Sequence, residues 1–230
     1  MAKLLLFDID GTLIDSNGAG GAAILDAAEQ HFGIRRDELP PLQLAGATDP
    51  AIAMDVFGHM NRSHTPEEIS EFLDRYLSNL QRRLQAEDFS GFTLPGVVPL
   101  LDALRAERAA HLGLLTGNVR RGAVIKLSRH GIYEHFIEGG FGSDHHDRNQ
   151  LGPVALQRMQ DATGRTYDIA DVIVIGDTPK DIRCAEAFGA KCLAVATGQY
   201  SAAELSALNP WRCVESFADV PAMMELLLRA

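Results

Sequence analysis

Short apolar runs, each stopped by a polar residue or a glycine, recur along the chain. The runs are LLLF (4–7), LGLL (112–115), FIEGGF (136–141), VIVI (172–175) and CLAVA (192–196). The segments between the later runs carry apolar residues at helical spacing, as in VVPLLDALRAE, PVALQRMQDA and DIRCAEAFGA. Continuous apolar strands that alternate with helices are typical of a parallel sheet covered on both faces. The pattern predicts an α/β fold with a Rossmann-like core, in which the glycines of FIEGGF suit a bulge as well as a strand.

Residues 17 to about 90 break this alternation, because no strand-like run occurs in them. One helix is predicted over about 19–32. A second begins at Thr65, the expected N-cap, with Pro66 at the first helical position and Glu68 completing a capping box. Seven apolar residues then recur at helical spacing, namely Ile69, Phe72, Leu73, Tyr76, Leu77, Leu80 and Leu84. A helical block after the first strand predicts an α-helical cap at 16–92, inserted into a core of residues 1–15 and 93–230.

The composition excludes several classes of function. Of 230 residues, 46% are apolar and 23% charged, which is average for a globular chain. The formal net charge of −10 argues against a general affinity for nucleic acid or an anionic membrane, because both require a positive surface. The three cysteines have no CxxC spacing and indicate neither a disulfide framework nor a zinc site. Because the chain has no signal-like or bilayer-length apolar stretch, we expect it in the cytoplasm.

Acidic and hydroxyl side chains follow three of the predicted strands. The first strand runs into DIDGTL (8–13), LGLL runs into TGN (116–118), and VIVI runs into GDTPKD (176–181). In an open parallel sheet, ligands bind outside the carboxyl ends of the strands. A lone DxD pair would more often be a turn that ends a strand, but a second acidic pair at an equivalent place favours one shared site.

A site with several carboxylates repels an anion unless a cation joins it. Mg²⁺ resolves this conflict, since it prefers oxygen ligands and bridges carboxylates to a phosphate group. In such a site Asp8 can attack phosphorus to form an aspartyl phosphate, and Asp10 can serve as acid and then as base. The Thr116 hydroxyl can hydrogen-bond the phosphoryl group. The pattern therefore predicts Mg²⁺-dependent phosphoryl transfer on a small phosphorylated metabolite.

DIDGTL, LLTGN and GDTPKD, in this order and separation, resemble the signature of the haloacid dehalogenase-like hydrolase superfamily. The resemblance runs along the whole chain and includes the helical cap. It implies that Asp8 is the nucleophile and Asp10 the general acid and base. It also implies that Asp177 binds Mg²⁺ together with Asp8 and the backbone carbonyl of Asp10, and that Asp181 acts on the metal indirectly.

The same resemblance assigns phosphate and substrate binding to Thr116, Gly117 and Asn118. One departure stands out, because the lysine that the family places shortly before the fourth-motif strand has no counterpart here. Arg148 lies in the corresponding region and is the expected substitute, since a guanidinium can pair two oxygens of a phosphate or carboxylate. Lys126 falls earlier, in a helix-like segment, and its replacement by alanine is expected to have little effect.

Two further features narrow the activity within the family. Dehalogenating members lack an aspartate at the position of Asp10, and phosphonate-cleaving members use a cap lysine, whereas this chain has no lysine between residues 4 and 125. Hydrolysis of a small phosphomonoester remains, and the pattern looks most like phosphoglycolate phosphatase-type members. The alternatives are a sugar-phosphate mutase and a catalytically silent binding module, although the silent module should lack at least one essential carboxylate.

Two segments near the predicted cap have more than one interpretation. The loop over 44–49 resembles a cap loop that faces the substrate in phosphoglycolate phosphatase-like members, but Thr48 and Asp49 are not counted among the expected substrate contacts. The glycine-rich segment 18–21 could be taken for a phosphate cradle. No strand leads straight into it, so a flexible entry into the cap is the preferred interpretation.

Overall fold

A computed structural model describes residues 2–107 and 109–229. Six strands form one sheet in the order β5-β4-β1-β6-β7-β8, and every neighbouring pair is parallel. The strands are β1 (Lys3–Phe7), β4 (Ala110–Thr116), β5 (Gly139–Phe141), β6 (Val172–Gly176), β7 (Lys191–Val195) and β8 (Arg212–Val214). All five predicted strands are present, and the predicted α/β fold with a Rossmann-like parallel core is confirmed. β5 covers only the end of FIEGGF, and β8 was not predicted.

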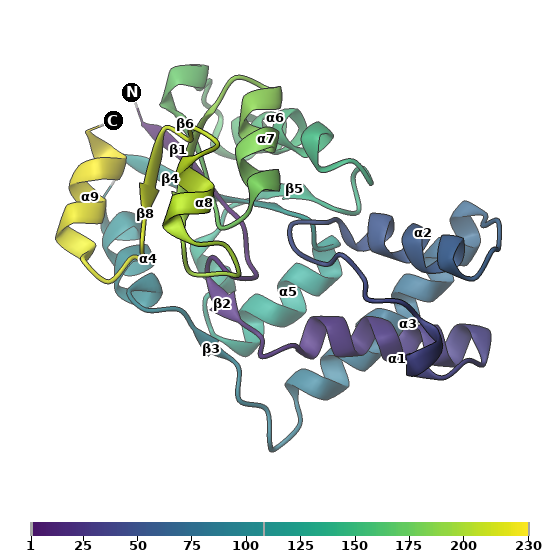
Figure 1. Cartoon of the computed structure of the whole chain (residues 1–230). Coiled ribbons are helices and arrows are strands. Elements are labelled where there is room, and N and C mark those ends of the chain that lie inside the picture. Colours follow the sequence, from purple (N-terminus) through teal and green to yellow (C-terminus); the bar gives the residue numbers. More distant parts are fainter. Residues whose placement is uncertain (1, 108, 230) are drawn as a thin grey trace.

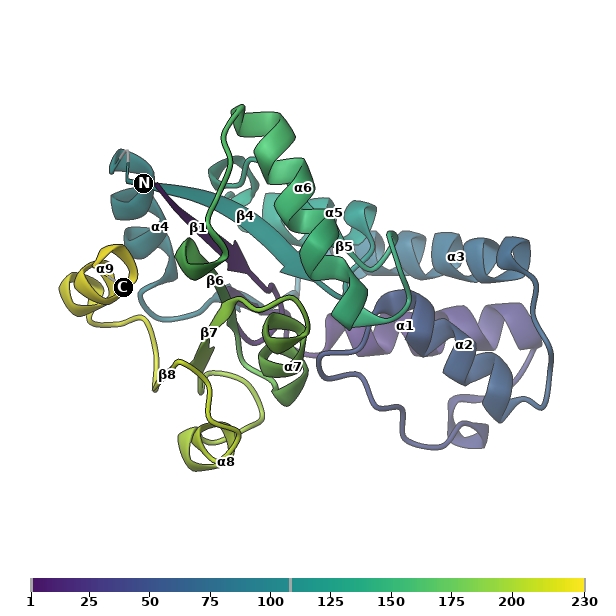
Figure 2. The same cartoon turned by 90° about the horizontal axis from the view of Figure 1, so that it is seen from above.

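Helices cover both faces of this sheet (Figures 1 and 2). In β1, Leu5 and Phe7 pack on one face with α4 (Val97–Ala106) and α9 (Val220–Leu228). Leu4 and Leu6 pack on the other face with α6 (Leu151–Thr163), α7 (Pro179–Ala187) and α8 (Ala202–Ser206). Successive side chains of a strand point to opposite faces, so a strand covered on both sides needs a continuous apolar run.

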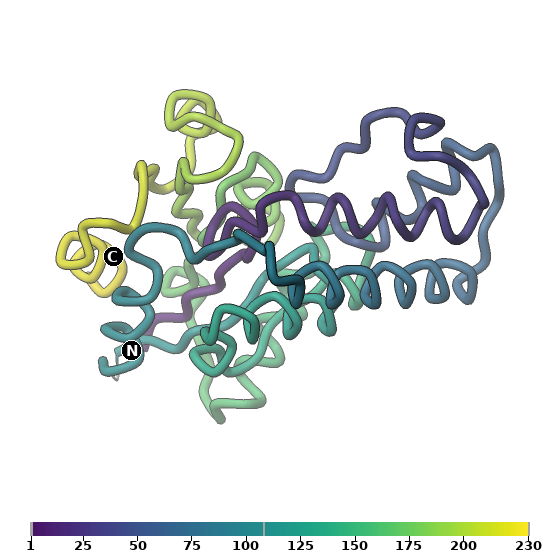
Figure 3. The backbone as a smooth tube through the Cα atoms, turned by 90° about the horizontal axis from the view of Figure 1, so that it is seen from below, coloured from purple at the N-terminus to yellow at the C-terminus, as the bar shows by residue number. Residues whose placement is uncertain are grey.

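Three helices form a separate layer beyond the carboxyl ends of the strands (Figure 2). They are α1 (Ala19–Phe32), α2 (Asp49–His59) and α3 (Pro66–Leu84), which share an apolar core of their own. α1 and α3 run side by side (Figure 3). The capping box of α3 is confirmed, because the Thr65 hydroxyl accepts from the Glu68 N–H at 3.2 Å and the Thr65 N–H donates to Glu68 at 2.7 Å. α1 has the predicted bounds, whereas α2 was not predicted.

Short elements join the two layers and connect the strands. β2 (Ile14–Asp15) and β3 (Phe92–Thr93) pair antiparallel where the chain leaves for the helical layer and returns from it. α5 (Arg120–Arg129) packs against both layers. The 3₁₀ turns are η1 (Arg36–Glu38), η2 (Tyr133–His135), η3 (Arg148–Gln150) and η4 (Ile169–Asp171). The division into a cap at 16–92 and a two-segment core stays a prediction.

Within residues 2–107 and 109–229, no helix has both the length and the apolar composition needed to cross a lipid bilayer. The cytoplasmic location stays a prediction.

Candidate active site

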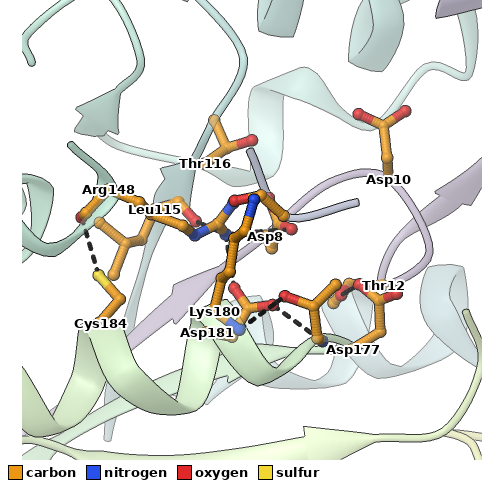
Figure 4. A network of polar contacts seen from close by, with 12 residues as sticks. Asp8, Asp10, Thr12, Leu115, Thr116, Arg148, Asp177, Lys180, Asp181 and Cys184 are labelled. Carbon is orange, nitrogen blue, oxygen red and sulfur yellow. Dashed lines mark hydrogen bonds and ion pairs between the residues drawn. The ribbon is translucent and has the colours of Figure 1, made fainter. Parts of the chain in front are cut away.

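Three adjacent strands deliver polar side chains to one edge of the sheet. Thr116 ends β4, Asp8 follows β1 and Asp177 follows β6, and these strands are neighbours in the sheet. The Asp8 N–H still bonds the Ile175 carbonyl at 2.9 Å, so the parallel ladder fixes the backbone of Asp8. Figure 4 shows Asp8 facing Thr116, Arg148 and Asp181. The sequence prediction that these motifs share one site agrees with this placement.

Asp8, Asp177 and Asp181 form a buried group of carboxylates, in which one oxygen of each lies within 4.8 Å of the others. Asp181 is placed by the start of α7, where Thr178 is the N-cap and the Thr178 N–H donates to Asp181 Oδ2 at 3.0 Å. The Thr12 hydroxyl donates to Asp177 Oδ1 at 3.1 Å. A local turn therefore orients Asp181, whereas a residue far away in the sequence orients Asp177.

Burial and mutual repulsion destabilise the ionised forms of these carboxylates when no cation is bound. Burial raises the pKa of Asp8 to about 6, although the Arg148 charge opposes the rise. Burial and the charges of Asp181 and Asp8 raise the pKa of Asp177 to about 8. A bound cation would stabilise the ionised carboxylates and reverse these shifts.

The oxygen donors suit a hard divalent cation. Two glycines also leave the Asp177 carboxylate room, because a Cβ on Gly11 would lie 2.4 Å from Asp177 Oδ2 and a Cβ on Gly198 only 1.8 Å from it. The arrangement fits a divalent cation held by Asp8 and Asp177. Asp181, predicted to act indirectly, has one oxygen bound by Arg148 and the other by Thr178.

The side chain of Asp10 stands apart from these three carboxylates (Figure 4). Its Oδ2 accepts from Lys126 Nζ at 2.6 Å and from Asn118 Nδ2 at 2.8 Å. Partial burial raises the pKa of Asp10, but the Lys126 charge and the hydrogen bonds outweigh burial, and the pKa is lowered overall. The metal role predicted for Asp10 concerns its backbone carbonyl and stays a prediction.

Lys126 is the residue that the sequence interpretation missed. It lies on α5 with only 4% of its surface exposed, and its Nζ donates to Asp10 at 2.6 Å and to Asn118 Oδ1 at 2.7 Å. The sequence did not predict Lys126 at the site, and these contacts place it there. They argue against the expectation that its replacement by alanine has little effect, which a rate measurement would test. One signal was present in the sequence, since Lys126 stands inside the apolar stretch AVIKL, whereas Arg120 and Arg129 flank it at the helix ends.

Arg148 lies where the sequence predicts a cation. It begins η3 and is 6% exposed, with Nη2 3.1 Å from Asp8 Oδ2 and 2.5 Å from Asp181 Oδ1. Its guanidinium also donates to the carbonyls of Gly46 at 3.2 Å and Leu115 at 3.4 Å. Among the described residues its Nε has no hydrogen-bond partner. One buried guanidinium thus pairs with two carboxylates and bonds both to the loop that leads into the helical layer and to the sheet.

The TGN segment fulfils three different structural tasks. The Thr116 hydroxyl is buried, accepts from Asn118 Nδ2 at 3.0 Å and hydrogen-bonds Asp8. Asn118 links Thr116 to Asp10 and Lys126. At Gly117 a Cβ would lie 2.1 Å from the Ala47 carbonyl oxygen, so only glycine lets the loop over 44–49 dock here.

That docked loop places Asp49 at the site and Thr48 behind it. The Asp49 N–H donates to the Gly117 carbonyl at 2.8 Å, and Asp49 Oδ2 accepts from the Val119 N–H at 2.8 Å. The Thr48 hydroxyl donates to the His146 carbonyl at 2.6 Å. Burial raises the pKa of Asp49 to about 6, although the Lys126 charge lowers it. Both residues hold the loop against the sheet.

A cavity of about 300 Å³ opens between the sheet edge and the helical layer. Its floor includes Asp8, Asp10 and Asp177, and its helical side includes Ile24, Ile52, Tyr76 and Asp49. Gly117 and Asn118 also line it, whereas Thr48 does not. Of the basic side chains in the described ranges, Lys126 and Arg148 line the cavity.

A family model described as haloacid dehalogenase-like hydrolase matches residues 5–186. The chain belongs to this family. The predicted membership is confirmed, and the chain is an enzyme of the hydrolase class. The matched span includes Asp8, Asp10, Thr116, Arg148 and Asp177.

Two curated relatives and a solved structure resemble the chain over nearly its whole length. A probable phosphatase IndB of Dickeya dadantii is 24% identical, over 100% of this chain and 96% of its own. A phosphoglycolate phosphatase of Chromobacterium violaceum is 28% identical, over 97% and 96% of the two chains. The crystal structure of a hydrolase from Pseudomonas syringae has a TM-score of 0.74 at 20% identity and covers 99% of both chains, which shows the fold. The resemblance to phosphoglycolate phosphatase-like members is thereby confirmed.

Proposed function

We propose that this haloacid dehalogenase-like hydrolase is a magnesium-dependent phosphatase that cleaves a small phosphomonoester through an aspartyl phosphate on Asp8. The main support is the position of the Asp8 carboxylate, which follows β1 and lies on the floor of the cavity, 3.1 Å from the Arg148 guanidinium. Phosphatases among the relatives add to this support.

In the first half of the proposed reaction, an Asp8 oxygen attacks phosphorus and the bond from phosphorus to the leaving oxygen breaks. The Arg148 guanidinium and the Thr116 hydroxyl hold the phosphoryl oxygens and offset their charge. Mg²⁺, held by Asp8, Asp177 and the backbone carbonyl of Asp10, would neutralise further negative charge of the phosphate. Asp10 gives its proton to the leaving oxygen.

In the second half, water attacks the phosphorus of the aspartyl phosphate, Asp10 takes a proton from that water, and the bond from Asp8 to phosphorus breaks. Lys126 and Asn118 hold Asp10 Oδ2, which orients the carboxyl group for both transfers. The lowered pKa keeps Asp10 ionised in the free protein. A phosphate dianion bound nearby would raise this pKa and make the proton donor available.

The substrate proposed here is small and phosphoglycolate-like. A cavity of about 300 Å³ suits a compact ligand, and apolar side chains such as Ile24 and Ile52 close it on the helical side. The leaving group would lie between Asp10 and these side chains.

Phosphate release from a panel of small phosphate esters with Mg²⁺, ranked by kcat/KM, tests the proposal. We expect release from at least one short ester and none from the Asp8→Asn variant. Transfer of the phosphoryl group to a second position of a sugar phosphate, without free phosphate, would instead indicate a mutase. Ligand binding without turnover would indicate a silent binding module.

A further inference from the structure

Lys126 carries a cation on the leaving-group side of the cavity. Its Nζ makes two hydrogen bonds, to Asp10 at 2.6 Å and to Asn118 at 2.7 Å. A lysine ammonium has three N–H donors. Within the described part of the chain, these two bonds therefore leave one donor of a 96% buried ammonium available at the cavity wall.

The start of α1 lies against the same ammonium. Gly20 lines the cavity, and a Cβ on Gly20 would stand 3.5 Å from Lys126 Nζ. The helix begins with Ala19-Gly20-Gly21, and its N-cap Gly18 makes no side-chain cap bond, so no acidic side chain offsets the positive end of the helix dipole. The absence of a side chain on Gly20 leaves the space beside Lys126 to a ligand.

The contact between Lys126 and Asp10 determines where this cation would lie relative to the leaving oxygen of a bound ester. The leaving oxygen must come within hydrogen-bond reach of the Asp10 carboxyl group, and Lys126 Nζ lies 2.6 Å from that same group. The ammonium therefore faces atoms one or two bonds past the leaving oxygen. The other basic lining residue, Arg148, lies beside Asp8 and is assigned to the phosphoryl oxygens, so it is not available to the leaving group.

We propose that Lys126 determines specificity by binding a carboxylate located two bonds from the ester oxygen. The inference rests on the proposed phosphatase function and narrows the substrate class to phosphate monoesters of short hydroxy acids. Two carboxylates, Asp10 and Asp49, also face this part of the cavity. Their repulsion disfavours a second phosphate dianion more than a singly charged carboxylate, which is why a carboxylate is the proposed group.

The test compares two nearly isosteric phosphate esters, 2-phosphoglycolate and the analogue in which a neutral carboxamide replaces its carboxylate. We expect wild-type kcat/KM to favour the carboxylate at least tenfold and Lys126→Met to reduce this ratio to within about threefold. Lys126→Arg should keep part of the preference. Lys191→Met is the matched control, since Lys191 lies on β7 against Trp211, outside the cavity, and should leave the ratio unchanged.

A ratio is needed because Lys126 also holds Asp10, so Lys126→Met should lower turnover of both esters. Equal losses on the two esters would overturn the proposal, as would a preference for ethylene glycol bisphosphate over 2-phosphoglycolate. Titration of the full-length protein with glycolate and glycolamide gives a readout without turnover. Glycolate should bind wild type at least tenfold more tightly, and equal binding would also overturn the proposal. If neither ester releases phosphate while glycolate still binds through Lys126, the phosphatase function fails and the carboxylate site stands.

Discussion

Replacement of Arg148 tests the site most directly, because the Arg148 guanidinium both neutralises carboxylates of the site and bonds to the backbone around it. Nη2 lies 3.1 Å from Asp8 and 2.5 Å from Asp181, and the same group binds two backbone carbonyls. Arg148→Ala removes all of these bonds. It leaves two buried carboxylates without their cation and the phosphoryl group without its fixed positive charge.

Two magnitudes follow from these contacts. Breaking a buried ion pair by removing one partner costs about 3–5 kcal/mol of folding free energy, because the remaining charge stays buried and unpaired. Loss of one cation from the phosphoryl site should lower kcat/KM by well over tenfold, which is more than ~1.4 kcal/mol of transition-state stabilisation. Arg148→Lys should recover part of the rate, since one ammonium restores the charge but cannot reach every partner of the guanidinium.

The two effects are separated by measuring urea unfolding without Mg²⁺ and kcat/KM with saturating Mg²⁺. Arg158→Ala is a suitable control, because Arg158 is also paired with a carboxylate, Asp144 at 2.6 Å, but does not line the cavity. This control should stay within about twofold of wild-type kcat/KM. If Arg148→Ala also retained kcat/KM within a few-fold while folded, the assignment of Arg148 to the phosphoryl site would be wrong.

Four other outcomes are expected. Asp8→Asn should abolish phosphate release, and a near wild-type rate would remove Asp8 as the nucleophile. Asp10→Asn should slow turnover by roughly 10²–10⁴-fold, and an unchanged rate with a poor leaving group would remove its acid role. EDTA should stop hydrolysis, and added Mg²⁺ should restore it. Added Ca²⁺ should not restore hydrolysis, because Ca²⁺ favours looser coordination. Full activity after exhaustive chelation would contradict a metal requirement. Gly198→Ala should lower kcat/KM at least ~tenfold, because the new Cβ would collide with the Asp177 carboxylate. Gly58→Ala is the control and should be neutral, since a Cβ at Gly58 meets nothing within 4 Å. Equal rates for the two variants would contradict the close packing at Asp177.

The features that could be predicted from the sequence depend on neighbours along the chain. β1 and β6 are continuous apolar runs because both faces of the sheet are covered. α3 begins where its capping box predicts, because Thr65 and Glu68 satisfy each other's backbone groups. The carboxylates Asp8 and Asp177 follow adjacent strands, so the edge they share could be predicted as well.

Of the elements that were missed, β8 lacks such a local signal, whereas α2 and α8 carry one at their first residues. β8 is an edge strand of three residues that is partly exposed, so it has neither the length nor the apolar run of a core strand. α2 begins at Asp49, and its N-cap Thr48 and the following Pro50 are start signals within a segment that also resembles a substrate-facing cap loop.

Lys126 shows why the site itself could be predicted only in part. The apolar spacing of α5 indicates which residues are buried, and Leu127 does pack in the core beside the sheet. It does not indicate which buried position faces the cavity, because that depends on where the helical layer sits against α5. In the folded chain Ile125 packs with the helical layer, so Lys126, between Ile125 and Leu127, is left facing Asp10. The positions of Asp8 and Asp177 follow from strand ends alone, whereas the lysine beside Asp10 follows only from the packing of two layers on one helix.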